Sequence, residues 1–155
     1  MIAELAMILV VLGLCDARAG RLPNQLNALL ALVGTVHVWS FMPEQLPASA
    51  GGAALGYAIV ALVAAYGRWR AGAPGIGMGD AKLLSAGGVW VGVGGVAMVL
   101  LIASCSALAS LLAGGPGVRE DIDGRGRRGI AFGPYLCFGI FATHLWQTFG
   151  DIPWL

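Results

Sequence analysis

Apolar runs long enough to cross a lipid bilayer dominate this sequence. A spanning helix needs roughly 20 apolar residues, and such runs lie at about 1–15, 26–42, 48–66, 81–113 and 129–149. The chain is 58% hydrophobic and 11% charged, with a mean hydropathy of +0.82, whereas soluble domains carry about 25% charged residues. We therefore expect an all-α integral membrane protein with a single transmembrane domain over residues 1–155.

The run at 81–113 is too long for one ordinary span. Gly92, Gly94 and Gly95 cluster near its middle, and glycine is the favoured residue where a helix ends. We expect two helices there, joined by a tight turn. The alternative is one long tilted or kinked helix. The division brings the total to six transmembrane helices.

The basic residues provide an independent test of this count. All 9 fall in three connections: Arg18 and Arg21; Arg68, Arg70 and Lys82; and Arg119, Arg125, Arg127 and Arg128. With six spans these connections share one face, which the positive-inside rule makes cytoplasmic, and both termini lie outside. The first run has Glu4 and no basic segment before it, so we interpret it as a span and not as a cleavable signal. We expect the glycine-rich loop at 114–128 to be mobile.

Two aspartates stand at span boundaries on the predicted cytoplasmic face. Asp16 ends the first run, and Asp80 begins the fourth. An ionisable group inside a membrane bundle is costly and is a candidate for function. Each aspartate alone could instead pair with a neighbouring basic side chain or cap a helix.

Together, the two aspartates indicate a specific chemistry. Two carboxylates held close in a low-dielectric site cannot both ionise easily, so the pair retains one proton. The ionised member can activate a water while the protonated member polarises a peptide carbonyl. This chemistry requires no metal or other cofactor. His37 and His144 lie near the outer ends of their spans, and we interpret them as packing or interfacial residues.

The glycines before Asp80 suit the same chemistry. Gly77 and Gly79 stand on either side of Met78, and glycine permits sharp turns and close approach of an extended peptide. A G-x-G-D sequence alone is a weak signal in a chain with 25 glycines. It gains weight from its place at a span boundary, on the same face as a second aspartate.

Three segments resemble the type IV prepilin peptidases, membrane aspartic proteases of the G-x-G-D group. D-A-R-A-G-R-L-P-N at 16–24 is similar to the family's first-aspartate segment, and G-M-G-D-A-K-L-L at 77–84 matches the second. F-G-P-Y-L at 132–136 matches a segment at the start of the last span. The three have the family's order, and the six-span layout agrees over nearly the whole chain.

The resemblance implies a peptidase that cuts a short basic leader from pilin-like precursors at the cytoplasmic face of the bacterial inner membrane. Asp16 and Asp80 would be the catalytic pair. The other motif positions would lie near the substrate: Gly77, Gly79, Lys82, Pro23, Asn24, Phe132, Gly133 and Pro134. The partners are then precursor proteins and membrane lipid. A net charge of +1 gives no footprint for nucleic acid.

Some of these roles stay open at this point. Lys82 could tune Asp80, contact substrate or simply extend to the membrane edge. Phe132, Gly133 and Pro134 could line the peptide site or only begin the last helix.

The cysteines mark one departure from longer family members, which carry paired C-x-x-C motifs associated with methylation of the new N-terminus. Cys15, Cys105 and Cys137 lie in apolar runs and form no such pair. We expect buried thiols, neither a disulfide framework nor a zinc site. The chain resembles the short, peptidase-only members found with Flp-type pilus systems, so we expect cleavage without methylation.

Three rival functions compete with this one. The first is a G-x-G-D protease for other membrane substrates. The second is a small transporter subunit in which Asp16 and Asp80 bind a cation or relay protons, and the third is a catalytically silent assembly partner. A transporter would more often place its carboxylates near the bilayer midplane.

Overall fold

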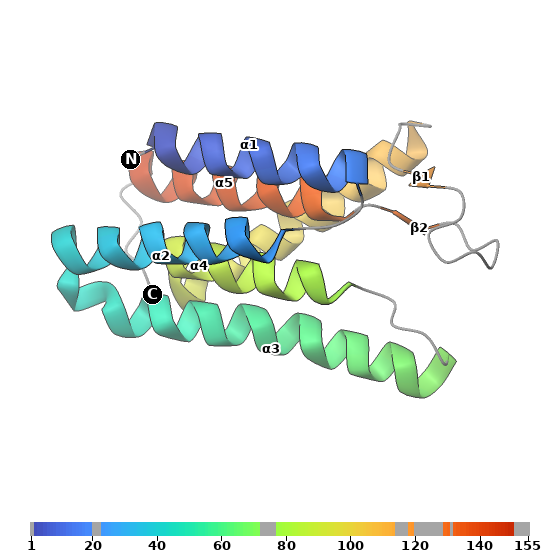
Figure 1. The fold of residues 1–155 in the computed structure, drawn as a ribbon, viewed down its shortest axis with the longest axis horizontal. Coiled ribbons are helices and arrows are strands. Elements are labelled where there is room, and N and C mark those ends of the chain that lie inside the picture. Colours follow the sequence, from blue (N-terminus) through green and yellow to red (C-terminus); the bar gives the residue numbers. More distant parts are fainter. Residues whose placement is uncertain are drawn as a thin grey trace.

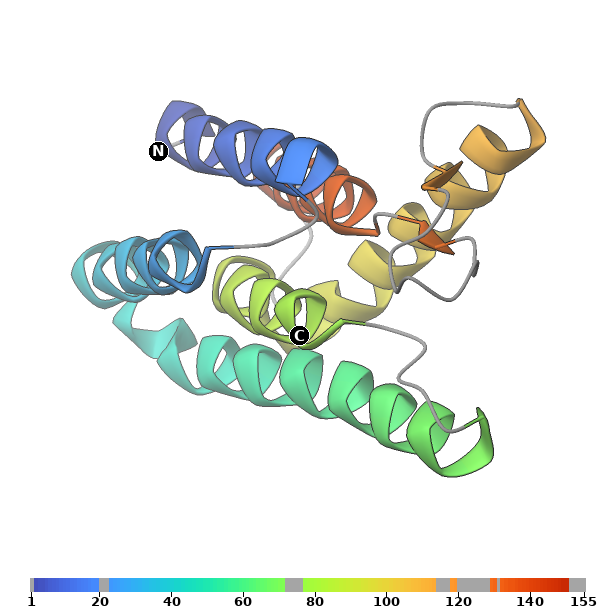
Figure 2. The ribbon, with the colours of Figure 1, turned by 45° about the vertical axis from the view of Figure 1, so that its right-hand side comes forward.

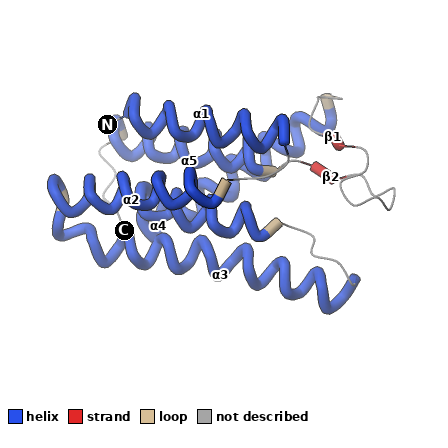
Figure 3. Tube along the Cα trace, viewed as in Figure 1, coloured by secondary structure: helices blue, strands red, loops and turns tan. Residues whose placement is uncertain are grey.

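The computed structural model describes residues 2–19, 23–71, 77–113, 118–119, 129–130 and 132–150. These residues form a mainly helical structure with one short strand pair (Figures 1 and 3). The elements are α1 (Ile2–Ala19), α2 (Asn24–Phe41), the 3-10 helix η1 (Pro43–Gln45), α3 (Leu46–Ala71), α4 (Met78–Leu112), β1 (Val118–Arg119), β2 (Gly129–Ile130) and α5 (Gly133–Phe149). Each apolar run of the sequence contains a helix, so the expected helical fold is confirmed.

Prolines and a glycine mark three of the helix boundaries. Pro23 precedes α2 in an extended conformation, and its carbonyl accepts hydrogen bonds from the backbone N–H groups of Leu26 and Asn27. Pro43 opens η1 directly after α2 has ended. Gly77 is extended at φ −70° and ψ 144° and stands immediately before α4. These residues suit such positions, since proline cannot continue a helix toward its N-terminus and glycine is flexible.

Gly92 breaks α4 into two arms. Its φ of 67° and ψ of −178° fall in a backbone region that essentially only glycine enters. The chain is helical on both sides of this residue, so the described residues contain five α-helices where we expected six. The expected division is present as a break at one glycine, and no separate turn intervenes. The two arms diverge in Figure 2.

The bundle places one set of helix ends together. α1 and α3 end, and α2, α4 and α5 begin, toward the right in Figure 1. α4 lies centrally and packs against α2, α3 and α5, whereas α1 packs mainly against α5 (Figure 2). β1 and β2 pair antiparallel at the same end, with Val118 opposite Ile130. The ends that carry the sequence motifs therefore meet on one side of the bundle.

Close backbone contact joins α3 to α4. A Cβ atom built on Gly52 would overlap the Gly88 carbonyl oxygen and lie 2.7 Å from the Gly92 carbonyl carbon. A Cβ atom on Gly88 would in turn overlap the backbone of Gly52 and lie 2.9 Å from the Ala53 nitrogen. Small residues at such crossings let helices approach without side chains between them. The spacing of α3 and α4 therefore depends on both glycines.

Trp90 joins α2 to α4 in the core. The side chain is 1% exposed, and its Nε1 donates a hydrogen bond of 2.9 Å to the Leu30 carbonyl. The indole fills the space beside Gly34, where a Cβ atom would lie 2.6 Å from Nε1. His37 stacks on the indole at 5.8 Å between ring centroids, and His144 meets it edge-on at 5.6 Å. This packing agrees with the structural role expected for both histidines.

Two helical segments, Pro43–Arg70 and Met78–Leu112, are long and apolar enough to cross a bilayer. Large apolar side chains are also exposed on every α-helix, including Met7, Leu32, Leu62, Leu101 and Phe138. Such a surface marks an interaction with lipid or with other proteins.

One expectation about the cysteines is wrong. Cys137 is buried and Cys15 is partly buried, but Cys105 is exposed, because it lies on an outer face of the second arm of α4. The three are free thiols. The expected mobility of the loop at 114–128 concerns residues that, apart from 118–119, lie outside the described part of the chain.

Replacing Gly92 tests the break in α4. We expect Gly92→Ala to lower the free energy of unfolding by about 1–3 kcal/mol, because alanine is strained at this backbone conformation. Denaturant titration in detergent, followed by circular dichroism, measures the change. Gly94→Ala is the matched control, because Gly94 is an exposed helical neighbour where alanine favours the helix. Equal stability of the two variants would contradict the role of Gly92.

Candidate active site

Asp16 lies in the last turn of α1 and is buried, with 7% of its surface exposed. Its carboxylate contacts the backbone of Gly133, the first residue of α5, and a Cβ atom there would overlap Asp16 Oδ2 and lie 2.8 Å from Cγ. The N-terminal end of a helix carries a partial positive charge, whereas the C-terminal end carries a negative one. The start of α5 therefore stabilises the negative charge of Asp16. The end of α1, where Asp16 lies, does not.

Asp80 lies in the first turn of α4 and is partly buried. Its backbone N–H donates to the Gly77 carbonyl at 3.1 Å. Its carboxylate accepts a hydrogen bond from the Gly77 backbone N–H. The third helical residue thus reaches back to the residue before the helix, as in one half of a capping box. This contact holds the carboxylate at the N-terminal end of α4.

The two aspartates are neighbours across helices. The charges of the two aspartates interact with each other, and both charges also act on the buried thiol of Cys137. Cys137 is one turn after Gly133 on α5, so three helices converge here: α1 with Asp16, α4 with Asp80, and α5 with Gly133 and Cys137. Two adjacent carboxyl groups with limited exposure favour a state that holds one shared proton. Such a pair can act as acid and base together.

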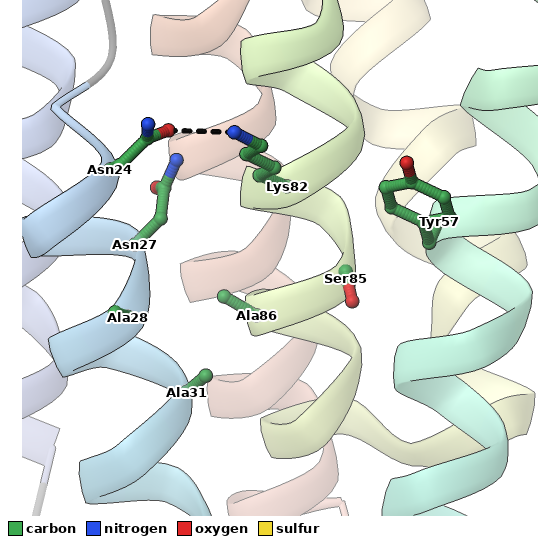
Figure 4. A pocket seen from close by; sticks show the side chains of 8 residues that line it. All are labelled: Asn24, Asn27, Ala28, Ala31, Tyr57, Lys82, Ser85 and Ala86. Atoms are coloured by element: carbon green, nitrogen blue, oxygen red, sulfur yellow. Dashed lines mark hydrogen bonds between the residues drawn. The ribbon is translucent and has the colours of Figure 1, made fainter.

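A hydrogen bond joins two of the sequence motifs on the other side of α4. Lys82 Nζ donates to Asn24 Oδ1 at 2.9 Å (Figure 4). Asn24 is the first residue of α2 and directly follows Pro23, which sets the start of that helix. The structure thus shows a contact of Lys82 with Asn24, which was none of the roles considered for this lysine.

The third motif begins α5. The Phe132 carbonyl accepts hydrogen bonds of 3.1 Å from the N–H groups of Tyr135 and Leu136, and Pro134 occupies the first turn. Pro134 also lines an apolar groove of about 410 Å³ between α1 and α5, which extends along Leu9, Gly13 and Phe138. These residues therefore start the helix, and Gly133 also meets an aspartate.

Two residues near these motifs were missed by the sequence reasoning. Cys137 looked like any thiol in an apolar run, yet the charges of both aspartates act on it. Asn27 is 4% exposed within α2 and one turn from Asn24. An amide inside an otherwise apolar helix was the available signal for Asn27. Within the described ranges, no three His, Cys, Asp or Glu side chains converge to hold a metal ion.

Comparison with known proteins identifies the family. Residues 3–112, which include both aspartates, match the model of the type IV leader peptidase family. The chain belongs to the type IV leader peptidase family. The earlier resemblance is thereby confirmed.

Individual relatives of this leader peptidase family member differ in length. The chain is 33% identical to leader peptidase HopD of Salmonella typhimurium over 142 residues, 90% of this chain and 88% of that protein. It is 33% identical over 131 residues to the prepilin leader peptidase/N-methyltransferase of Escherichia coli K12, and 32% identical over 147 residues to that of Burkholderia pseudomallei 1026b. These matches cover 84% and 93% of this chain but only 56% and 45% of the two relatives. No solved structure matches the chain.

Replacing Gly133 tests the contact that holds Asp16. We expect Gly133→Ala to lower the peptidase activity roughly a hundredfold, because the added methyl group displaces the carboxylate and catalysis is sensitive to shifts of about 1 Å. Cleavage of a pilin-like precursor measures the activity, and thermal unfolding measures the stability.

Gly13→Ala is the matched control at the same α1–α5 interface. A Cβ atom on Gly13 would lie 3.9 Å from Cys137 Cβ, which is ordinary contact. Activity in Gly133→Ala equal to that of Gly13→Ala would show that the Gly133 contact does not position Asp16.

Proposed function

We propose that the chain is a membrane aspartic endopeptidase that removes the leader peptide of type IV prepilin-like precursors. The proposal is supported by the electrostatic interaction between Asp16 of α1 and Asp80 of α4, in a chain of the leader peptidase family. Relatives named as prepilin leader peptidases support the substrate class.

The proposed reaction uses the two carboxyl groups as one unit. The ionised carboxylate removes a proton from a water molecule, whose oxygen attacks the carbonyl carbon of the scissile peptide bond. The protonated carboxyl group donates its proton to the carbonyl oxygen, which gives a neutral tetrahedral intermediate. Proton transfer to the departing nitrogen, with return of a hydroxyl proton to the dyad, then breaks the C–N bond and restores the starting state.

The proposed topology has six crossings of the bacterial inner membrane, with the two arms of α4 as separate spans. The supporting feature is charge: the basic connections predicted to be cytoplasmic follow α1, α3 and α4, whose ends lie at one end of the bundle (Figure 1). The dyad then lies at the cytoplasmic membrane edge. A water reaches a dyad at this depth more easily than one near the midplane.

We also propose that this chain cleaves the precursor without methylating the new N-terminus. No C-x-x-C pair occurs among the three cysteines. The chain matches 88% of a relative named only as a leader peptidase, and about half of those also named as N-methyltransferases.

Replacing each aspartate tests the dyad. We expect Asp16→Asn and Asp80→Asn each to lower precursor cleavage at least about a hundredfold, since general acid–base catalysis contributes about 10²–10⁴. Precursor and enzyme are co-expressed, and a gel shift with the mass of the new N-terminus reports the product. The new N-terminus should be unmethylated.

Cys137→Ala serves as a control near the dyad, because the thiol takes no part in the proposed reaction. Normal cleavage by either folded aspartate variant would exclude the dyad mechanism. A methylated product from the purified enzyme would exclude the peptidase-only activity.

A further inference from the structure

An open cavity of about 400 Å³, mainly apolar but with several polar side chains in its lining, lies between α2, α3 and α4, apart from the dyad (Figure 4). Its lining residues come from three helices: Asn24, Asn27, Ala28 and Ala31 of α2; Tyr57 of α3; and Lys82, Ser85 and Ala86 of α4. The alanines leave its floor small and apolar, while the hydrogen-bonding groups gather toward one end in Figure 4.

Asn27 is the unusual residue of this cavity. The side chain is 4% exposed, yet neither Nδ2 nor Oδ1 has a hydrogen-bond partner among the described residues. In Figure 4 its amide points to the space below the Asn24–Lys82 hydrogen bond. An unpaired buried amide costs free energy, since it has lost water and gained no partner. No described residue supplies this partner, and a group that enters the cavity would do so.

The unsatisfied atoms define the chemistry of that group. Nδ2 needs an acceptor and Oδ1 needs a donor, so a carboxylate or phosphate would satisfy only half of the amide. An extended residue presents its N–H and its C=O, which belong to successive peptide groups, on the same side of the chain and so satisfies both. Within the described ranges Lys82 uses one of its three N–H donors, on Asn24, which leaves two for carbonyl groups at the rim.

We propose that this cavity binds the backbone of an unwound segment of the substrate, with Asn27 pairing to the N–H and C=O of one extended residue. The proposal rests on the proposed peptidase function. A helix must unwind before a protease can cleave it, and its freed N–H and C=O groups find no partners in lipid. Asn27 and Lys82 supply such partners at the depth where the first turn of α4 begins.

The position of the cavity relative to the dyad sets how far along the substrate the bound segment lies from the scissile bond. Asp80 and Lys82 are two residues apart on α4 and therefore face nearly opposite sides of that helix. The N-terminal end of α4 at Gly77 and Met78 is exposed, so a peptide can pass over it from one side of the helix to the other. A helix is about 10 Å wide, and an extended residue spans about 3.3 Å, so the bound segment lies about three residues from the scissile bond.

Replacing Asn27 by leucine, which has a similar size, separates a ligand contact from a structural one. We expect Asn27→Leu to lower kcat/KM about tenfold for a synthetic precursor peptide that the wild type cleaves, because two hydrogen bonds are lost. Thermal stability should stay equal or rise, because an unpaired buried amide has been removed. Thr35→Val on the same helix is the control, and its kcat/KM should not change; Thr35 bonds only to the Ala31 carbonyl in its own helix.

A modified substrate tests the backbone contact itself. An ester in place of one peptide bond, placed in turn two, three and four residues from the scissile bond, removes an N–H donor. One of these positions should lower wild-type kcat/KM, with little further loss when the same peptide meets Asn27→Leu. Losses that multiply at every position would overturn the contact, as would an unchanged kcat/KM in Asn27→Leu. If Asn27→Leu does not fold, Asn27→Ala takes its place.

The lipid arm of the experiment distinguishes a headgroup from a peptide. Each enzyme is assayed in nanodiscs of phosphatidylcholine alone and of phosphatidylcholine with phosphatidylglycerol. A loss in Asn27→Leu that occurs only with phosphatidylglycerol would assign the cavity to an anionic headgroup and overturn the proposal. Absence of wild-type cleavage for every precursor would instead contradict the proposed peptidase function, and this inference would fail with it.

Discussion

The close approach of α3 and α4 at Gly52 and Gly88 is the constraint on which the site depends. Backbone contacts backbone there, so neither helix can shift without creating overlap or a void. In lipid, where hydrophobic burial does little to hold helices together, such contacts carry much of the packing. α4 also bears Asp80, Lys82 and Trp90. Its position therefore decides where the aspartate pair, the cavity beside Asn27 and the ring contacts of Trp90 lie.

The two aspartates are held by backbone groups at helix ends. Asp80 is held by Gly77 before its own helix, and Asp16 by Gly133 at the start of another. Helix ends present the N–H groups that the helix itself leaves unpaired, so they suit a carboxylate without requiring a basic side chain.

The sequence predicted the helices and singled out the two aspartates as candidates because the signals for both are local. Runs of apolar residues mark helices, and a carboxylate at a span boundary is conspicuous within a few residues. Contacts between distant residues have no such signal: nothing near Asp16 indicates that Gly133 will lie against its carboxylate. The same holds for Asn27, whose importance lies in lacking a partner once the helices are assembled. Gly92, Gly94 and Gly95 were equivalent candidates for the break, and only the assembled structure distinguishes Gly92.

The hydrogen bond from Trp90 to the Leu30 carbonyl has a mechanical consequence for α2. It fixes the helix at a point less than one turn below Asn27, while the upper end of α2 is attached to α4 through Asn24 and Lys82 at a solvent-exposed position. The lower bond is buried and strong, whereas water competes with the upper one. A small tilt of α2 about Leu30 would therefore widen the rim of the cavity at Asn24 and leave its floor near Ala31 unchanged.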